Sequence, residues 1–416
     1  MAEKVEFYRE TEFKDTKIGK LPEEWEVMVA ADVADYINGY PFSPTDWKMH
    51  GIPIIRIQNL NDPNAEFNCF DGTIDDIYKI KNGDLLFSWS ASIGIYIWKG
   101  GDAVLNQHIF KVVPKANINK LFLYYDLLLA IEQLKSRVHG STMKHFQKNE
   151  LKTTFIPIPP LPEQQKIAEI LSTVDESIQK TDDIIAKTER LKKGLMQELL
   201  TRGIGHKEFK DTGIGKIPKE WDVVKLDEVC MKIKAGGTPL TSRKEYYNGN
   251  IPFVKIEDMT SSYKYLKSTS ATITEAGLKN SNAWLVPVKS LLVAMYGSIG
   301  AIAINEIEAT TNQAILGILP IEEKTNVEFL FYLLTHLKPL LKKYAKQTTQ
   351  ANLTAEIIKN FKVALPNYFE QQKIAEILST VDEKLEILKQ EKVKLERIKR
   401  WFMQELLSGR IRVRVA

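Results

Sequence analysis

The sequence contains little cysteine, and this excludes several classes of protein. Its 416 residues include two cysteines, Cys69 and Cys230, which are too few for a disulfide scaffold and form no CxxC pair for zinc. We therefore expect a reducing, cytoplasmic environment. The amino-terminal residues MAEKVEFYRETEFKD lack the apolar segment of a secretory signal. The longest apolar run, 121–131, is interrupted by Asp126 and is too short to span a bilayer.

The motifs of common enzymes are also missing. The sequence has no GxxxxGK(S/T) loop for a nucleoside triphosphate, no GxGxxG after a predicted strand, no HExxH and no EF-hand loop. The six histidines are scattered, and the nearest pair, His139 and His145, has no carboxylate at metal-ligating spacing. The Asn/Asp-Pro-Pro-aromatic loop of an amine methyltransferase is absent, since the nearest string, LPNYFEQQ from Leu365, has the wrong order. We expect a chain that is not itself an enzyme and that holds no metal.

Net charge and length set broad limits. A formal charge of +4 permits nucleic-acid binding but is far from the strong basic bias of a histone-like protein. The 44% hydrophobic and 26% charged residues are typical of a globular protein. At roughly 150 residues per domain, the length predicts two or three domains.

The sequence contains an internal duplication. EQQKIAEILSTVDE occurs at Glu163–Glu176 and again, identically, at Glu370–Glu383, an offset of 370 − 163 = 207 residues. FKDTKIGKLPEEWEV from Phe13 is repeated as FKDTGIGKIPKEWDV from Phe209. MQELL from Met196 recurs from Met403. A domain-sized period indicates a duplication and not a solenoid.

Each half predicts a compact α+β domain followed by a long helix. In the first half, short β-branched or aromatic runs separated by turn residues predict strands, and one apolar run predicts a helix. The proline-rich FIPIPPLP then predicts a new helix from near Leu161, while the second copy lacks PPLP, so its helix start is expected to differ. The predicted strands are 52–57, 84–87, 93–98 and 109–113, the helices 120–138 and 327–344, and the domains 1–160, 161–203, 204–366 and 367–416.

The two long helices carry an apolar seam of heptad type. Both run for about 38 residues, or roughly 57 Å, which is longer than a small domain is wide. One alternative is that each helix lies on its own globular core, but we favour an antiparallel intramolecular coiled coil that relates the halves by a pseudo-two-fold axis. The seam residues are Leu378, Val381, Leu385, Leu388, Leu395, Phe402 and Leu406, interrupted by Lys392 and Lys399, and Leu171, Val174, Ile178, Ile185, Leu195 and Leu199, interrupted by Thr181, Thr188 and Lys192.

Polar residues that differ between the halves are candidates for recognition. Asn106–Gln107 and Asn312–Gln313 are shared by both halves, so they either read adenine edges or close a turn, and we favour the turn. A common scaffold with exchanged polar side chains is expected of two modules that read different sequences. The candidate contact residues are Trp47, Lys48, Arg56, Gln58, Ser90, Ser92, His139, Ser141, Thr142, Lys144, His145 and Lys148, and Arg243, Lys244, Lys255, Tyr296, Ser298, Lys346, Gln347, Thr348, Thr349 and Gln350.

Taken together, the blocks resemble the specificity subunit of Type I restriction–modification systems over the whole chain. Four strings carry the resemblance: PLPEQQKIAEILSTVDE from Pro160, its second copy from Phe369, the MQELL closures, and GIGKIPKEW from Gly213. The resemblance implies two target-recognition domains that each read half of a split DNA site, with the coiled coil fixing the gap. It also implies a prokaryotic cytoplasmic protein without catalytic activity.

The same resemblance implies partners. Two methyltransferase subunits and the restriction–translocase subunits are expected to bind the chain and to hold S-adenosylmethionine, ATP and Mg²⁺, so the chain itself needs no cofactor. We expect weak DNA binding by the chain alone. The residues expected to form the coiled coil and the docking surfaces are Gln164, Gln165, Ile170, Leu171, Val174 and Ile178, and Gln371, Gln372, Ile377, Leu378, Val381, Leu385 and Leu388.

A competing hypothesis is a bivalent scaffold that binds proteins or glycans through two domains on a coiled-coil spacer. A DNA reader is expected to gather its basic residues on one concave face of each domain, whereas a scaffold would scatter them. The residues that decide this are Lys48, Arg56, Lys144 and Lys148 in one half, and Arg243, Lys244, Lys255 and Lys346 in the other.

Overall fold

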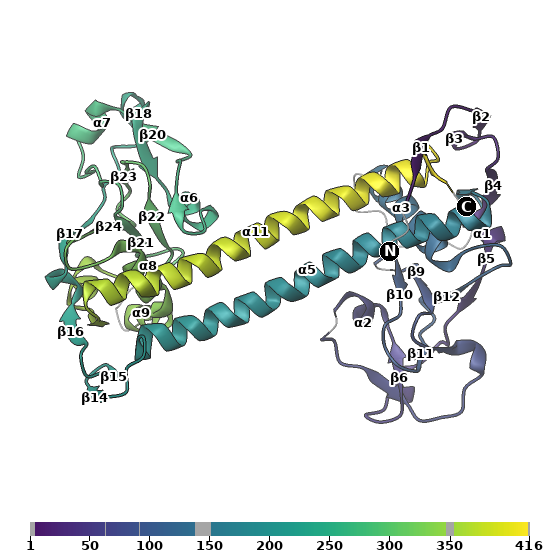
Figure 1. The fold of residues 1–416 in the computed structure, drawn as a ribbon, viewed down its shortest axis with the longest axis horizontal. Coiled ribbons are helices and arrows are strands. Elements are labelled where there is room, and N and C mark those ends of the chain that lie inside the picture. The colour runs from purple at the N-terminus through teal and green to yellow at the C-terminus, as the bar shows by residue number, and fades with distance from the viewer. Residues whose placement is uncertain (1–4, 63, 91, 138–150, 347–352, 415–416) are drawn as a thin grey trace. The chain divides into compact units, whose positions relative to one another are not determined.

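The structure is a computed structural model that describes residues 5–62, 64–90, 92–137, 151–346 and 353–414. The chain divides into two compact units, residues 1–182 with 390–416, and residues 183–389. Both units contain part of the two long helices, α5 (Leu161–Arg202) and α11 (Tyr368–Leu406), which are labelled in Figure 1. No helix of the described residues is long and apolar enough to cross a membrane.

The first unit is built from small mixed sheets. One sheet has the order β10-β9-β12-β5 and a second the order β7-β6-β11-β8, in which β11 runs parallel to β6. Three further pairs are β13-β4, β2-β3 and β1-β26. The bounds are β1 Phe7–Arg9, β2 Phe13–Thr16, β3 Gly19–Pro22, β4 Glu26–Val29, α1 Ala30–Val33, β5 Ala34–Asn38, β6 Ile52–Ile55, α2 Ile57–Asn61, β7 Asn68–Phe70, β8 Lys79–Ile80, β9 Leu85–Ser88, β10 Gly94–Ile97, β11 Ala103–Leu105, β12 Ile109–Pro114, α3 Lys120–Arg137, β13 Phe155–Ile158 and β26 Ile411–Val413.

The second unit repeats this plan with additions. Its larger sheet has the order β17-β24-β21-β22-β19, its smaller sheet is β20-β18-β23, and β14-β15 and β16-β25 form pairs. The bounds are β14 Phe209–Thr212, β15 Gly215–Pro218, β16 Asp222–Lys225, β17 Cys230–Ala235, β18 Tyr247–Val254, α6 Ile256–Ser261, β19 Tyr265–Leu266, β20 Ala271–Ile273, α7 Glu275–Lys279, β21 Leu291–Ala294, β22 Ile302–Asn305, β23 Thr310–Thr311, β24 Ile315–Pro320, α8 Val327–His336, α9 Lys338–Lys346, α10 Ala355–Asn360 and β25 Lys362–Leu365.

One expectation about the helices is wrong. The helix predicted over 327–344 is broken at Leu337 into α8 and α9, because Pro339 lacks the N–H that a continuous helix would need in its interior. The second long helix, which lacks PPLP, differs from the first in its cap but not in its position, since α11 begins at Tyr368, the counterpart of Leu161. The Asn367 side chain replaces the prolines as a cap, accepting a hydrogen bond of 3.0 Å from the Glu370 amide.

The first and last strands of the chain lie side by side in the first unit (Figure 1). They are antiparallel, with Phe7 opposite Val413 and Arg9 opposite Ile411. At the counterpart position of the second unit, the covalent segment 203–208 joins α5 to β14. In the first unit, therefore, the pairing of β1 with β26 joins the start of the domain to the segment after α11. In the second unit the peptide chain itself joins α5 to the start of the domain.

The hydrophobic core of each unit includes residues of both long helices, α5 and α11. In the first unit Trp25 and Phe122 are fully buried with Leu171 of α5 and Leu406 of α11. In the second unit Trp221 and Phe329 are buried in one core with Leu378 of α11 and Leu200 of α5. Each domain thus contacts the start of its own long helix and the end of the other.

In both units α5 and α11 run antiparallel, which confirms the predicted coiled coil, and the polar interruptions of the seam are satisfied. Lys392 pairs with Asp182 at 2.7 Å in the first unit, and Lys192 pairs with Asp382 at 2.6 Å in the second. The buried Thr181 hydroxyl donates to the Ser177 carbonyl oxygen of its own helix. Polar seam residues of this kind specify one register at a cost in stability.

Candidate DNA-reading loops and helix joints

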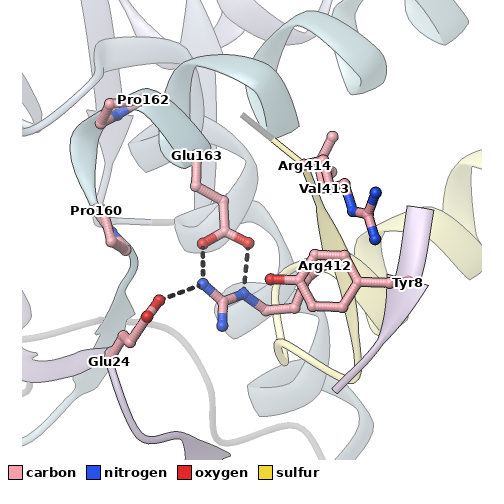
Figure 2. Close-up of a pocket in the computed structure, with 8 residues that line it drawn as sticks. All are labelled: Tyr8, Glu24, Pro160, Pro162, Glu163, Arg412, Val413 and Arg414. Atoms are coloured by element: carbon pink, nitrogen blue, oxygen red, sulfur yellow. Dashed lines mark hydrogen bonds and ion pairs between the residues drawn. The ribbon is translucent and has the colours of Figure 1, made fainter. Parts of the chain in front are cut away.

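The glutamate that opens the repeated sequence is the centre of a buried joint in the first unit. Both oxygens of Glu163 bind the Arg412 guanidinium, at 2.7 Å from Nε and 2.8 Å from Nη2, and Oε2 also accepts from Trp25 Nε1 at 3.1 Å. Figure 2 shows Arg412 between Glu163 and Glu24. Burial alone would lower the pKa of Arg412, but these carboxylates and Glu10 raise it, so the residue stays charged.

The second unit builds the same joint with different partners. Glu370 Oε2 accepts from Trp221 Nε1 at 3.1 Å, as Glu163 does from Trp25. Its other contacts come from the segment after α5: the Ile204 amide donates to Oε1 at 2.9 Å, and His206 Nε2 lies 2.9 Å from the same oxygen. In each unit a buried carboxylate therefore joins the domain to the segment that follows the opposite long helix.

The first glutamine of each EQQ is also structural, which the sequence alone does not reveal. Gln164 is buried, accepts from the Asn119 amide and donates to the Pro159 carbonyl oxygen. Gln371 makes the corresponding bonds to the Asn326 amide and the Pro366 carbonyl oxygen. Neither side chain is open to a partner in this structure, and the same holds for the buried Leu171 and Leu378. The neighbouring Gln165 and Gln372 are exposed.

A second repeated contact joins each domain to both long helices. In the first unit Asp175 of α5 accepts from the Tyr125 hydroxyl of α3 at 2.8 Å and pairs with Lys399 of α11 at 2.6 Å. In the second unit Asp382 of α11 accepts from Tyr332 of α8 at 2.6 Å. Lys192 of α5 lies 2.6 Å from the same carboxylate. We call each Lys–Asp–Tyr set a clamp.

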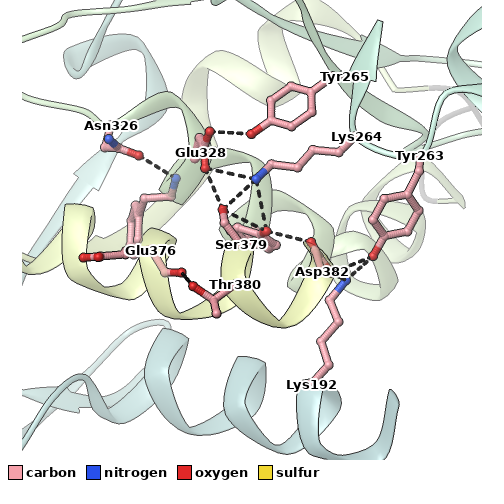
Figure 3. Close-up of polar contacts among 12 residues, drawn as sticks. Lys192, Tyr263, Lys264, Tyr265, Asn326, Glu328, Glu376, Ser379, Thr380 and Asp382 are labelled. Carbon is pink, nitrogen blue, oxygen red and sulfur yellow. Dashed lines mark hydrogen bonds and ion pairs between the residues drawn. The ribbon is translucent and has the colours of Figure 1, made fainter. Parts of the chain in front are cut away.

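The second clamp is enlarged by residues that precede and begin β19 (Figure 3). Lys264 is almost fully buried, and its Nζ lies 3.0 Å from Glu328 Oε2, 3.1 Å from the Tyr332 hydroxyl and 2.8 Å from Ser379 Oγ. Tyr263 also donates to Asp382 at 3.0 Å. Burial raises the pKa of Tyr332, and its hydrogen bond to Asp382 raises it further.

Three of the predicted contact residues of the first domain are brought together beside β7. The Arg56 guanidinium lies 4.6 Å from the centre of the Trp47 ring and donates to Asn68 Oδ1 at 2.9 Å. Lys48 forms an isolated bridge with Cys69 of the same strand and is exposed. The ring of Trp47 and the amide oxygen of Asn68 thus fix the direction of the Arg56 guanidinium.

The counterpart region of the second domain has a different arrangement. Arg243 and Lys244 are exposed neighbours, with Arg243 3.4 Å from the Glu245 carboxylate. Lys255, the counterpart of Arg56, is exposed at the start of α6. Its amide donates to Asp258, as the Arg56 amide does to Asn59, so Asn59 and Asp258 cap short helices, while the exposed Gln58 stays a candidate.

The shared Asn–Gln pairs lie in tight turns. Asn312 Oδ1 accepts from the Ala314 amide at 3.0 Å, which confirms the turn-closing role for this residue. A Cβ on Gly236 would lie 2.0 Å from the Thr311 carbonyl oxygen, and one on Gly39 would lie 2.2 Å from that of Asn106. Glycine is therefore required where the neighbouring strand passes these turns.

The remaining candidates have varied surroundings. Tyr296 donates to the Gln313 carbonyl oxygen at 2.9 Å, and Ser298 is exposed in the following turn. Ser90 is buried, and the carbonyl oxygen of half-buried Ser92 accepts from Ser88. The candidates His139, Ser141, Thr142, Lys144, His145, Lys148, Gln347, Thr348, Thr349 and Gln350, and the side chain of Lys346, lie outside the described residues.

Comparison with known proteins identifies the duplicated architecture. The model of the Type I restriction modification DNA specificity domain matches residues 22–190 and, a second time, residues 218–397. The chain belongs to the Type I restriction–modification specificity subunits. Two specificity subunits of Methanocaldococcus jannaschii, the putative MjaX and MjaVIII, are each 31% identical to it over 99% of the chain and 99% and 98% of their own lengths.

Solved structures agree on the fold. The S subunit of a Type I restriction–modification system from M. genitalium superposes with a TM-score of 0.58 at 17% identity, covering 92% of this chain and 96% of that one. A chain from a study of complex assembly in the type I system gives a TM-score of 0.56 over 94% of this chain and 99% of that one, also at 17% identity. The two-domain specificity-subunit architecture predicted from the repeats is confirmed.

One group in the first domain of this specificity subunit has no counterpart in the second. Asp126 of α3 is 5% exposed, and burial raises its pKa to about 8. Leu333 takes its place in the second domain. The nearby Tyr36 hydroxyl is buried without a hydrogen-bond partner in the described structure, and its counterpart is Ile233. A polar pair in the first core thus replaces an apolar pair in the second.

Proposed function

We propose that this chain is the non-catalytic subunit that gives a Type I restriction–modification complex its DNA specificity, each domain reading half of a bipartite, asymmetric site. One observation carries the proposal: the same joint is built twice, at Glu163 and Glu370, around loops whose polar side chains differ. The repeated joints give the two halves the same structure around their long helices, which is expected if the same partner binds to each half. The loops differ between the halves, which is expected if each domain reads a different half-site.

The proposed base and phosphate contacts are the predicted loop residues. Arg56 is the strongest candidate in the first domain, because Trp47 and Asn68 hold a guanidinium whose fork can bind guanine O6 and N7. Its counterpart Lys255 offers a single cation and therefore different chemistry. Lys48, Arg243 and Lys244 are proposed to contact phosphates, which position a protein without reading sequence.

The long helices are proposed to dock two methyltransferase subunits and to set the gap between half-sites, with restriction–translocase subunits joining that complex. Of these repeated positions Gln165, Gln372 and Ile377 are exposed, Ile377 by 38%, whereas Ile170 is half-buried against the first core. S-adenosylmethionine, ATP and Mg²⁺ are assigned to the partners. A cytoplasmic location accords with free Cys69 and Cys230, and a prokaryotic source accords with the relatives. The protein- or glycan-binding scaffold gains no support from the relatives.

The test is to co-express the chain with the methyltransferase subunit of its own genome and to map methylated bases by single-molecule sequencing. We expect a split motif with one gap. Arg56→Ala should change the bases read in one half, and Lys255→Ala those in the other. A wild-type pair that methylates nothing, or a variant that alters both halves alike, would contradict the proposal.

A further inference from the structure

The two clamps differ in a way that bears on how the DNA is read. Each clamp ties three elements: the tyrosine comes from a helix of the recognition domain, the aspartate from the helix that follows it, and the lysine from the antiparallel helix. The lysines interrupt the apolar seam, so they are retained at positions where leucine would pack. An ion pair in such a position favours one geometry over near alternatives.

The second clamp has an additional layer that the first lacks in the described part of the chain. Lys264 bonds to Glu328, Tyr332 and Ser379, so the segment that leads into β19 is tied to both α8 and α11. In the first domain Leu121 is the counterpart of Glu328. Ser172, the counterpart of Ser379, donates to the Glu169 carbonyl oxygen of its own helix at 3.0 Å.

We propose that the clamps are positioning devices that hold each recognition domain at one orientation on the long helices. The first clamp, which has no layer like that of Lys264 in the described residues, is the more easily released. This inference rests on the proposed DNA-reading function. If a recognition domain changes its orientation on the long helices, its own base contacts stay intact, but the position of these contacts along the duplex changes. Loss of a clamp is therefore expected to change the accepted gap and not the bases read.

The unequal clamps supply matched variants. Asp175→Asn removes the charge that binds Lys399 in the first unit, and Asp382→Asn makes the same change in the second. Asp175→Asn loses a charged hydrogen bond, so the preference for sites with the wild-type gap over sites with other gaps should fall about tenfold. Asp382→Asn should keep the wild-type gap, because Lys264 still holds the domain.

A third variant makes the second domain resemble the first. Lys264→Met with Glu328→Leu removes the additional layer without leaving an unpaired charge, as in the first domain, where the counterpart of Glu328 is Leu121. Adding Asp382→Asn to this pair should then relax the gap as Asp175→Asn does. Should Asp175→Asn fail to fold, Tyr125→Phe keeps the ring and removes the hydroxyl alone, and Tyr332→Phe is its match.

Two measurements on the full-length chain test whether the clamps set the orientation of the recognition domains. With the methyltransferase co-expressed, sequencing gives the gap distribution of the methylated sites. On the chain alone, spin labels at positions 82 and 180 in the first unit, and at the counterpart positions 288 and 387 in the second, report the spread of domain–helix distances. We expect Asp175→Asn to broaden the first distribution and Asp382→Asn to leave the second narrow.

Equal effects of the two aspartate variants, or altered half-site bases at an unchanged gap, would overturn the inference. If wild type shows one motif and every variant shows the same motif and the same label distances, the clamps do not position the domains, while the proposed function stands. Absence of any wild-type motif refutes the proposed function, and the label distances then still decide whether the clamps hold the domains.

Discussion

Replacing Asp126 by leucine is expected to stabilise the first recognition domain, and the gain should depend on pH. Burial holds the pKa of this carboxyl at about 8, against 3.8 for an ordinary aspartate. The native state therefore keeps its proton where the unfolded chain has lost it. Unfolding releases a proton between these two pKa values, so stability falls as pH rises through this window.

The magnitude follows from the difference between the pKa values. Each pH unit costs about 1.4 kcal/mol, and pH 7 lies 3.2 units above 3.8, so Asp126 costs about 4 kcal/mol at neutral pH. Below about pH 4 this cost vanishes. The advantage of Asp126→Leu over wild type should therefore grow by about this amount between acid and neutral pH.

Amide hydrogen exchange in α3 is the suitable assay, because it reports the opening of this domain separately from the other unit. Asp126→Asn is the control, since it keeps a buried polar group that does not titrate. Leu333→Asp should create the same pH dependence in the second domain. If wild type and Asp126→Asn lose protection in parallel between about pH 5 and about pH 7.5, the carboxyl is not held neutral and the reasoning fails.

Three other perturbations test the joints and the interfaces. Arg412→Met leaves Glu163 buried without its cation and should lower the free energy of unfolding of the first unit by about 3–5 kcal/mol, measured by urea titration; wild-type stability would contradict the joint. Ile377→Glu should leave the fold intact, as measured by circular dichroism, but weaken binding of the methyltransferase subunit, as measured by sedimentation. Glu386→Gln, on the same helix, is the control and should leave this binding unchanged. If Ile377→Glu also leaves binding unchanged, the surface around Ile377 is not part of the interface. DNA binding by the chain alone, followed by fluorescence anisotropy, should be weak and should fall steeply as salt rises, and nanomolar binding of its site in physiological salt would show that the partners are not needed.

The sequence predicted what depends on repetition and periodicity. An identical EQQKIAEILSTVDE at two places implied two equivalent settings, and the seam implied paired helices, because a 3.5-residue repeat of apolar residues has to be buried. The four strands predicted in the first half, at 52–57, 84–87, 93–98 and 109–113, lie within two positions of β6, β9, β10 and β12, whereas the other strands were not predicted. The break between α8 and α9 was missed, although Pro339 was visible, because the apolar run continued past it.

The sequence did not separate side chains that face a partner from those that face the protein itself. Gln164 and Gln165 are adjacent and both polar, yet one is buried and bonded to its own domain and the other is exposed. One hydrogen-bond partner of Gln164, the Asn119 amide, lies 45 residues away in the chain, and no local pattern identifies it. Lys192 and Lys399 appeared as faults in the seam, whereas the structure gives each an aspartate on the opposite helix.

The pairing of β1 with β26 has a consequence for how the protein is made on the ribosome. The second unit is contiguous, so it can fold as soon as residues 183–389 have emerged. The first must wait for Met403, Leu406 and Val413, which complete its core, and for Arg412, which neutralises Glu163. Synthesis of the intervening 207 residues takes roughly 10–40 s. During that time the apolar residues around Trp25 and Leu171 are not yet covered by the carboxy-terminal segment. The domain that is synthesised first is therefore the last to complete its core.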